Sequence, residues 1–320
     1  MEIVVIGTGQ LGSRHLQSLV ALTTGHSLHA VEPSAAAQAL ARKRLGPAAN
    51  RVRFHSGLVT LPATVDVVVV ATGASVRRRV VTKLLQGCRV RFLILEKILF
   101  QSVADCLWSR DFIAQAGATA WVNFPRRLQP VYRGLQSTLR MDEALEISVT
   151  GSRWGLATSA VHFLDLVLYL SRATEIRINK VDMQTFPSPR HQGCIEATGR
   201  ITGETSPGVS FSLAACATGD APVKIAVDSA EHRWVVTERD HEALALHAAR
   251  DTGWAWVPTT SPLYYQSQLT GPLVEELVAT GSCGLATLDE ALRSHLPFLR
   301  SWNRYFAPTA DADLTACSVT

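Results

Sequence analysis

The sequence predicts an α/β protein of two domains: a doubly wound parallel sheet, followed by a second α/β domain with an open, mostly antiparallel sheet. Strand-like and helix-like segments alternate over the first third of the chain, the order that builds a parallel sheet. After residue 175 the pattern becomes an alternation typical of strands, interrupted by turns rich in Pro and Gly. A length of 320 residues is enough for two domains. We expect the first at 1–120 and the second, which ends in two helices, at 121–320.

The first residues of the chain combine a strand, a glycine-rich turn and the start of a helix. Residues 3–6 are apolar, and Gly7, Gly9 and Gly12 follow in G-x-G-x-x-G spacing before a helical pattern that runs to residue 22. This is the context that a dinucleotide-binding turn requires. The first glycine allows the tight turn, the second lets the backbone approach a pyrophosphate, and the third lets the helix pack closely on the strand. The pattern predicts a Rossmann domain.

An acidic residue, Glu32, ends the next strand about twenty residues later, where such domains hold the adenosine ribose. A carboxylate there repels a 2′-phosphate, and no arginine follows it directly, so we expect NAD in preference to NADP. The alternative is a plain βαβ unit with a glycine-rich turn and a surface glutamate. The expected cofactor contacts in this stretch are Gly7, Thr8, Gly9, Gln10, Leu11, Gly12 and Glu32.

The rest of the first domain alternates regularly. We expect helices at 34–45, 76–86 and 102–116, and strands at 51–55, 65–71, 92–95 and 118–122. The β-branched run 65–71 is typical of a strand buried on both faces. It ends at Ala71 and Thr72, and the strand 92–95 delivers Glu96 and Lys97 to the same carboxyl edge, where ligands collect. All four residues are therefore expected to contact the cofactor.

The second domain begins with a loop at 123–130. We expect helices at 131–140, 156–170, 264–280 and 288–305, a strand at 145–150, and four to six strands between 175 and 247. The tail at 307–320 is small and polar.

Two groups of residues are candidates for proton chemistry. A lysine such as Lys97, if desolvated at the sheet edge, can exchange a proton with a substrate hydroxyl; the alternative is a salt-bridging Glu96–Lys97 pair at the surface. On the helix 156–170, Thr158, His162 and Asp165 share one face, so Asp165 is expected to orient His162. The alternative for His162 is a core histidine.

Composition excludes several classes of protein. A formal charge of +4, with basic residues only in short groups, does not indicate a nucleic-acid partner. The groups at 42–44 and 77–79 are expected to be solvated. The six cysteines are scattered without metal-site spacing, and no apolar run reaches the roughly eighteen residues of a membrane span. No signal peptide precedes the first strand, so we expect a cytoplasmic protein that binds no metal and no membrane.

Together these stretches resemble the glucose–fructose oxidoreductase, inositol dehydrogenase and rhizopine-catabolism family, Gfo/Idh/MocA. The resemblance rests on the order and spacing of the motifs Gly7–Gly12 with His15, Ala71-Thr72, Glu96-Lys97, Arg127 followed by Pro130, and the helix with Gly155, His162 and Asp165. It implies NAD(P)-dependent oxidation or reduction of sugars or polyols. It also implies a homo-oligomer, a dimer or tetramer, built through the open sheet face.

The resemblance implies that Lys97 and His162 handle the proton while hydride moves to or from the nicotinamide. The sequence departs from the family in two places. Ile98 stands where many members have a proline, and Thr158 stands where the helix often carries an aspartate. A hydroxyl supplies no charge, so the resemblance leaves Lys97 and His162 without a partner that the family often has.

One branch of the family, linked to surface-polysaccharide sugar biosynthesis, has similar motifs, which implies a nucleotide-linked or otherwise activated sugar. The candidate substrate contacts are Arg126, Arg127, Tyr132, Trp154 and Asp165. For the arginines and the tyrosine the alternative is structural pairing between loop and helix. Two other functions stay open: a sensor that binds NAD or sugar without turnover, as in a yeast repressor of this family, and an epimerase or lyase that recycles its cofactor.

Overall fold

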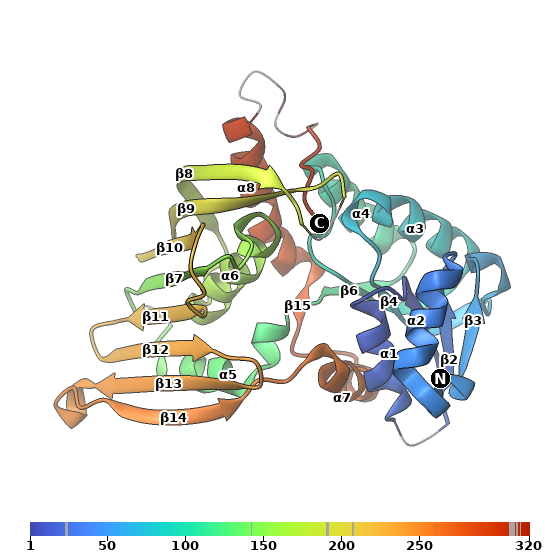
Figure 1. Cartoon of the computed structure of the whole chain (residues 1–320), viewed down its shortest axis with the longest axis horizontal. Coiled ribbons are helices and arrows are strands. Elements are labelled where there is room, and N and C mark those ends of the chain that lie inside the picture. Colours follow the sequence, from blue (N-terminus) through green and yellow to red (C-terminus); the bar gives the residue numbers. More distant parts are fainter. Residues whose placement is uncertain are drawn as a thin grey trace. The chain divides into compact units, whose positions relative to one another are not determined.

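The computed structural model describes residues 1–320 except 23, 24, 142, 190, 191, 207, 307–310, 312 and 314. The chain forms two compact units (Figure 1). The first contains Met1–Phe100, Asp105–Pro125 and Tyr264–Asp289; the second contains Gln101–Ala104, Arg126–Leu263 and Glu290–Thr320. Among the described residues, no helix is long and apolar enough to cross a membrane.

The first unit is built on a seven-stranded sheet in the order β15-β6-β5-β4-β1-β2-β3. Its strands are β1 (Glu2–Ile6), β2 (Ser27–Val31), β3 (Val52–His55), β4 (Thr64–Val70), β5 (Arg89–Leu95), β6 (Thr119–Val122) and β15 (Ala286–Thr287). β1 to β6 pair in parallel, and only β15 is antiparallel. The central strands are fully buried along their apolar runs, as expected of a sheet covered on both faces.

Helices connect these strands in the predicted order. They are α1 (Gly12–Val20), α2 (Ala35–Leu45), α3 (Ala74–Gly87) and α4 (Val103–Gln115), with short 3₁₀ turns η1 (Gly46–Arg51) and η2 (Leu58–Thr60). The alternation of strand and helix confirms the Rossmann prediction. Ser34 caps α2 as its sequence suggests, accepting a hydrogen bond from the Ala37 amide at 3.3 Å.

The first unit also takes in a segment from late in the chain, which corrects the expected boundary at residue 120. α7 (Gln266–Thr280) packs on α1: the Gly271 amide donates to Ser18 Oγ at 2.8 Å, and a Cβ on Gly271 would lie 2.8 Å from the Ser18 carbonyl oxygen. β15 then adds a strand beside β6. Burying this segment on α1 joins it to the first sheet, although it lies far away in sequence.

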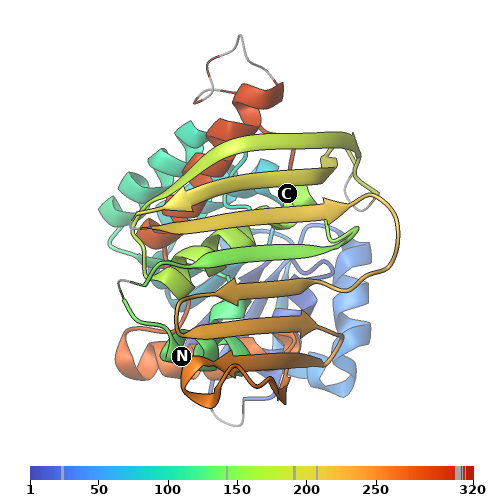
Figure 2. The same cartoon turned by 90° about the vertical axis from the view of Figure 1, so that its left-hand side faces the viewer.

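The second unit contains the predicted open sheet, which Figure 2 shows face-on, in the order β14-β13-β12-β11-β7-β10-β9-β8. Its strands are β7 (Glu146–Ser152), β8 (Ile176–Pro187), β9 (Ile195–Thr205), β10 (Val209–Cys216), β11 (Lys224–Asp228), β12 (His232–Glu238), β13 (Glu242–Ala249) and β14 (Val257–Pro262). Only the β7–β10 pair is parallel. β14 was not predicted, because it is an exposed edge strand that contains prolines and lacks an apolar alternation.

The helices of the second unit are α5 (Pro130–Thr138), α6 (Leu156–Ser171) and α8 (Leu288–Phe306). Two short 3₁₀ turns accompany them: η3 (Pro125–Leu128) precedes α5, and η4 (Arg250–Thr252) follows β13. α6 packs against β9 and β10 and is buried over most of its surface. The strands β7 and β10 alternate buried and more exposed positions, as expected when one face of the sheet carries the helix. This packing fixes the position of the His162 helix on its sheet.

Candidate functional site

The glycine turn after β1 has the geometry that its sequence predicts. Gly7 has a φ of +85°, which favours glycine, and a Cβ there would lie 3.0 Å from the Thr72 amide nitrogen. A Cβ on Gly12 would lie 1.7 Å from the Gly7 carbonyl oxygen, whereas a Cβ on Gly9 would meet no protein atom within 4 Å. Gly12 is therefore needed for the packing of α1, and the backbone at Gly9 is open to a ligand.

Glu32 lies at the end of β2 with its carboxylate fixed beside this turn. Its Oε2 accepts a hydrogen bond from the Thr8 amide at 2.9 Å, and its Oε1 accepts one from the Ser34 amide at 3.0 Å. The residue is 9% exposed. Because a carboxylate can accept about four hydrogen bonds, two positions are left for donors on a bound molecule.

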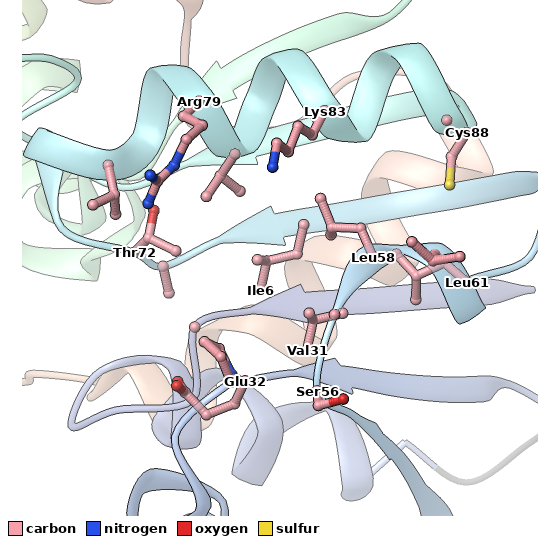
Figure 3. Close-up of a pocket in the computed structure, with 18 of the residues that line it drawn as sticks. Ile6, Val31, Glu32, Ser56, Leu58, Leu61, Thr72, Arg79, Lys83 and Cys88 are labelled. Carbon is pink, nitrogen blue, oxygen red and sulfur yellow. The ribbon is translucent and has the colours of Figure 1, made fainter.

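A cleft of about 1110 Å³ opens at this edge of the sheet, large enough for a dinucleotide (Figure 3). Five predicted cofactor residues line it: Gly7, Gly9, Glu32, Ala71 and Thr72. The others, Thr8, Gln10, Leu11, Gly12, Glu96 and Lys97, do not belong to its lining. Figure 3 shows Ile6 and Val31 from β1 and β2 along one side of the cavity.

Two basic side chains of α3 point into this cleft, and neither was predicted as a site residue. Arg79 and Lys83 extend from the helix toward the cavity in Figure 3. Arg79 was expected to belong to a solvated group. Arg79 and Lys83 lie one turn apart on α3 and share a helix face with the cleft residues Val76 and Val80, so helical periodicity could have indicated both.

Glu96 is held in a buried network that spans four elements of the first unit. Its Oε1 lies 2.9 Å from His15 Nε2 and accepts a hydrogen bond from Asn123 Nδ2 at 2.5 Å. Gln266 Oε1 accepts from Asn123 at 2.7 Å, and Thr270 Oγ1 lies 2.8 Å from His15 Nδ1. Gln266 Nε2 closes the ring by donating to Thr270 Oγ1 at 2.8 Å.

This network controls the charge of Glu96. Burial alone would raise the pKa of the Glu96 carboxyl, but the hydrogen bond and charge of His15, with contributions from Asn123 and Arg77, hold it below its ordinary value. Glu96 is therefore a buried carboxylate rather than the surface salt-bridge partner of Lys97 that was considered as an alternative. It fixes the backbone directly before Lys97.

Arg77 fixes the backbone on the other side of Lys97. Its guanidinium donates to the carbonyls of Thr72 and Ile98 and, at 2.7 Å, to that of Leu99. Burial lowers the pKa of Arg77 to about 10, still far above neutral pH. The expectation that this arginine is solvated is wrong, because its charge is used to join the turn after β4 to the segment after β5. The peptide bond between Lys97 and Ile98 is cis, although no proline follows the lysine.

In the second unit, Thr158 lies in the first turn of α6 and His162 one turn further, both half-buried. The Thr158 hydroxyl donates to Glu196 Oε2 on β9 at 2.7 Å. Trp154 precedes the helix; its indole Nε1 donates to the Ala214 carbonyl at 2.9 Å, and its ring packs edge-on against Phe163. Glu196 was not predicted as a site residue, since only the fold brings it to this helix.

Asp165 does not orient His162, which corrects that expectation. Both carboxylate oxygens of Asp165 accept from the Arg127 guanidinium, at 2.8 and 2.9 Å, and Glu290 lies 3.4 Å from the same arginine. Arg127 and Asp165 are 8% and 1% exposed. They form a buried bidentate ion pair that joins η3 to α6, so this geometry does not support substrate contacts by either residue.

Tyr132 and Arg126 also bind another side chain of the protein, the carboxylate of Glu238. The Tyr132 hydroxyl donates to Glu238 at 2.6 Å, and Arg126 forms a two-bond pair with the same carboxylate at 2.7 and 2.8 Å. Burial opposes ionisation, yet the Arg126 guanidinium and the Tyr132 hydroxyl hold the pKa of Glu238 below its ordinary value. The alternative of structural pairing describes these residues better than substrate binding does.

Among the described residues, no group of three His, Cys, Asp or Glu side chains is placed to hold a metal ion. The buried carboxylates among the site residues described above are engaged with protein donors or cations.

The fold and the cleft define a two-domain protein with a dinucleotide-type Rossmann unit, and comparison with known families agrees. Residues 1–124 match the model of the GFO_IDH_MocA family, described as an oxidoreductase family with an NAD-binding Rossmann fold. The first unit is therefore similar to the NAD-binding Rossmann domain of that oxidoreductase family. No curated protein sequence matches the chain.

Several solved structures share the fold over nearly the whole chain. One is UDP-N-acetylglucosamine 3-dehydrogenase from Acidithiobacillus ferrooxidans, with 15% identity, a TM-score of 0.72, and 94% of this chain and 96% of that chain covered. Another is an oxidoreductase from Agrobacterium radiobacter in complex with NAD⁺, L-tartaric acid and magnesium, with 14% identity, a TM-score of 0.73 and 98% of both chains covered. A super-repressor mutant of Gal80p from Saccharomyces cerevisiae has 13% identity, a TM-score of 0.71 and 98% coverage of both chains.

Proposed function

We propose that this protein is an NAD-dependent oxidoreductase that transfers hydride between nicotinamide and a carbinol carbon of a sugar, a polyol or a nucleotide-linked sugar. The observation that carries the proposal is the arrangement at the carboxyl edge of the first sheet. There the glycine turn and Glu32 line an open cleft, and Lys97 follows β5 at the same edge between two fixed pieces of backbone.

The cleft residues fit NAD. The open backbone at Gly9 leaves room for a pyrophosphate at the start of α1, and Glu32 has free acceptor positions for ribose hydroxyls. Arg79 and Lys83 supply positive charge on the wall formed by α3. The Glu32 carboxylate disfavours a 2′-phosphate, so we propose NAD rather than NADP as the preferred cofactor.

NAD, when bound, accepts or supplies the hydride. We assign the proton to Lys97 with His162 as its partner. Lys97 is half-buried, and Arg77 and the Glu96 network hold the backbone on both sides of it, which limits the conformations of its side chain. A fixed, partly desolvated amine can take a proton from a substrate hydroxyl as hydride leaves the same carbon, or return it in the reverse direction. His162 then stabilises or exchanges that proton.

A second candidate function is a sensor that binds NAD or a sugar without turnover. The fold is compatible with that role, since the Gal80p super-repressor mutant shares it. The absence of a carboxylate on α6 at position 158 also favours it. The third candidate, an epimerase or lyase that recycles its cofactor, uses the same groups but releases no net NADH.

The test is NADH formation from NAD⁺ with a panel of free sugars, polyols and nucleotide-linked sugars. We expect Lys97→Met to abolish turnover while NADH affinity stays within a few-fold of wild type. Lys43→Met, an exposed lysine on α2, is the matched control and should behave as wild type. Normal turnover by Lys97→Met would refute the assignment, and tight NADH binding with no turnover by wild type on any substrate would favour the sensor.

A further inference from the structure

A buried carboxylate from another element lies at the first turn of the His162 helix. Glu196 on β9 is 8% exposed. Its Oε1 accepts from the amides of Ala157 at 2.7 Å and Ala197 at 2.9 Å, and more weakly from Thr158 at 3.4 Å. Its Oε2 accepts from Thr158 Oγ1 at 2.7 Å. Both oxygens of the Glu196 carboxylate therefore accept hydrogen bonds from the protein, which fix its orientation.

The start of α6 is shaped around this carboxylate. The residue before the helix is Gly155, which has a φ of +79° and offers no side chain as a cap. A Cβ on Gly155 would lie 2.8 Å from both Glu196 Oε2 and Thr158 Oγ1. Glu196 thus takes the place of a capping side chain and places a negative charge at the positive end of the helix. A larger residue at position 155 would collide with the Glu196 carboxylate, and the helix start at Gly155 has no cap other than that carboxylate.

His162 needs a negative neighbour if its imidazole is to carry a proton during turnover. Four positions lie about one turn from it on α6, Thr158 and Ser159 before it and Asp165 and Leu166 after it, and of these only Asp165 carries a carboxylate. Both oxygens of Asp165 accept from the Arg127 guanidinium, whose positive charge offsets that of the carboxylate. Thr158 carries no charge of its own, but its hydroxyl hydrogen bonds to the carboxylate of Glu196.

We propose that Glu196, acting through the Thr158 hydroxyl, is a positioning residue that supplies the negative charge for His162. The inference rests on the proposed function of His162. Because the Thr158 hydroxyl proton points to Glu196, the oxygen of Thr158 presents acceptor lone pairs to its surroundings. Both this dipole and the carboxylate behind it favour the protonated imidazole one turn along the helix.

Other charged groups that the structure describes near α6 make hydrogen bonds or ion pairs of their own. Arg126 lies over the Phe163 ring but is bound to Glu238, and Arg127 is bound to Asp165. On β9, Arg200 donates to Ser212 at 3.3 Å. Arg133 on α5 donates to the Arg127 carbonyl at 3.1 Å. Glu196 is the carboxylate joined by a hydrogen bond to Thr158, one turn before His162, so removing its charge should change the pKa of His162.

The first test measures the pKa of His162 directly, by NMR titration of its imidazole, with the signal assigned by its loss in His162→Asn. A unit charge about 7 Å away shifts a pKa by about half a unit in bulk water and by about 1.5 units at an effective dielectric constant of about 20. We expect Glu196→Gln to lower the pKa of His162 by an amount in this range. Glu204→Gln, on the exposed part of the same strand, is the control and should leave it unchanged. An unchanged His162 pKa in Glu196→Gln overturns the proposal.

The second test exchanges the position of the charge. Thr158→Asp alone places two carboxylates within hydrogen-bond distance and should lower kcat, because like charges at that site oppose each other. The double variant Thr158→Asp/Glu196→Gln puts one carboxylate back on α6 and should recover the wild-type pH profile of kcat. A double variant no better than Thr158→Asp contradicts the inference.

The outcomes separate this inference from the proposed function. If wild type turns over no substrate, the oxidoreductase proposal fails, but the NMR titration still reports whether Glu196 acts on His162. If wild type turns over substrate and Glu196→Gln changes only the melting temperature, Glu196 is a helix cap and nothing more, and the positioning role is refuted. Circular dichroism identifies any variant that does not fold.

Discussion

Replacing Glu32 by glutamine should change the choice between NAD and NADP. The carboxylate is held by the Thr8 and Ser34 amides at 2.9 and 3.0 Å, so it cannot turn away from a group that enters the ribose site. A 2′-phosphate bound there would place a second negative charge about 4 Å from the carboxylate, the separation of two charged groups in close contact. The substitution Glu32→Gln keeps the shape of the side chain but removes its charge.

The size of the effect follows from Coulomb's law. Two like charges about 4 Å apart repel by about 1 kcal/mol in bulk water and about 4 kcal/mol at an effective dielectric constant of about 20. The cleft is open to solvent on one side, so about 2 kcal/mol is a reasonable middle value, which corresponds to a change of about 30-fold in the ratio of the two dissociation constants. NADPH binding should tighten, and NADH binding should weaken by the loss of one hydrogen-bond acceptor.

The assay is a fluorescence titration of NADH and NADPH with wild type, Glu32→Gln and the surface control Glu276→Gln. The control should match wild type, because Glu276 is an exposed residue of α7. Melting curves check that the loss of one acceptor for the Thr8 or Ser34 amide has not unfolded the turn. If Glu32→Gln keeps the wild-type NADH/NADPH ratio within about threefold, Glu32 does not select the cofactor and the reasoning is wrong.

Three further perturbations follow from the same geometry. Gly12→Ala should lower the free energy of unfolding by about 3 kcal/mol and abolish NADH binding, since its Cβ would overlap the Gly7 carbonyl; denaturant unfolding and the NADH titration measure both. Arg127→Ala should cost about 3 to 5 kcal/mol of stability by leaving Asp165 buried and unpaired, and a loss below about 1 kcal/mol in denaturant unfolding would contradict a buried pair. Glu96 has a folded pKa below its ordinary 4.5, so it stabilises the fold above pH 4.5 and this contribution is lost as the pH falls through the folded pKa. Melting temperatures of wild type should therefore fall more steeply below pH 4.5 than those of Glu96→Gln, and parallel curves would argue against the His15–Glu96 network.

Local pattern predicted the fold well because the first domain repeats one unit. The buried β-branched runs and the glycine spacing are properties of contiguous residues, and these predicted the strands and the turn to within a few residues. The prediction of the open antiparallel sheet was also confirmed, since its alternation is local. The membership of α7 in the first unit could not be predicted this way, because Gly271 and Ser18 meet only after the chain has folded.

The candidate site was predicted less completely, because its chemistry depends on which partner each side chain finds. Thr158, His162 and Asp165 share a helix face, and the pattern favoured Asp165 as the partner of His162. The fold instead gives Asp165 to Arg127 and brings Glu196 from a strand to Thr158. Hydrogen bonds and ion pairs between elements distant in sequence decide whether a polar side chain can contact a substrate. Helical periodicity alone cannot predict these pairs.

The most direct test of the account is a single-turnover experiment with the protein in excess over NAD⁺ and the sugar panel added. Wild type should form NADH in proportion to the NAD⁺ supplied, even if a recycling reaction later returns the hydride. Lys97→Met should form none while it binds NADH with nearly wild-type affinity. If wild type binds NADH tightly and forms none with any sugar, polyol or nucleotide-linked sugar, the claim that this protein is a hydride-transfer enzyme for such substrates is contradicted.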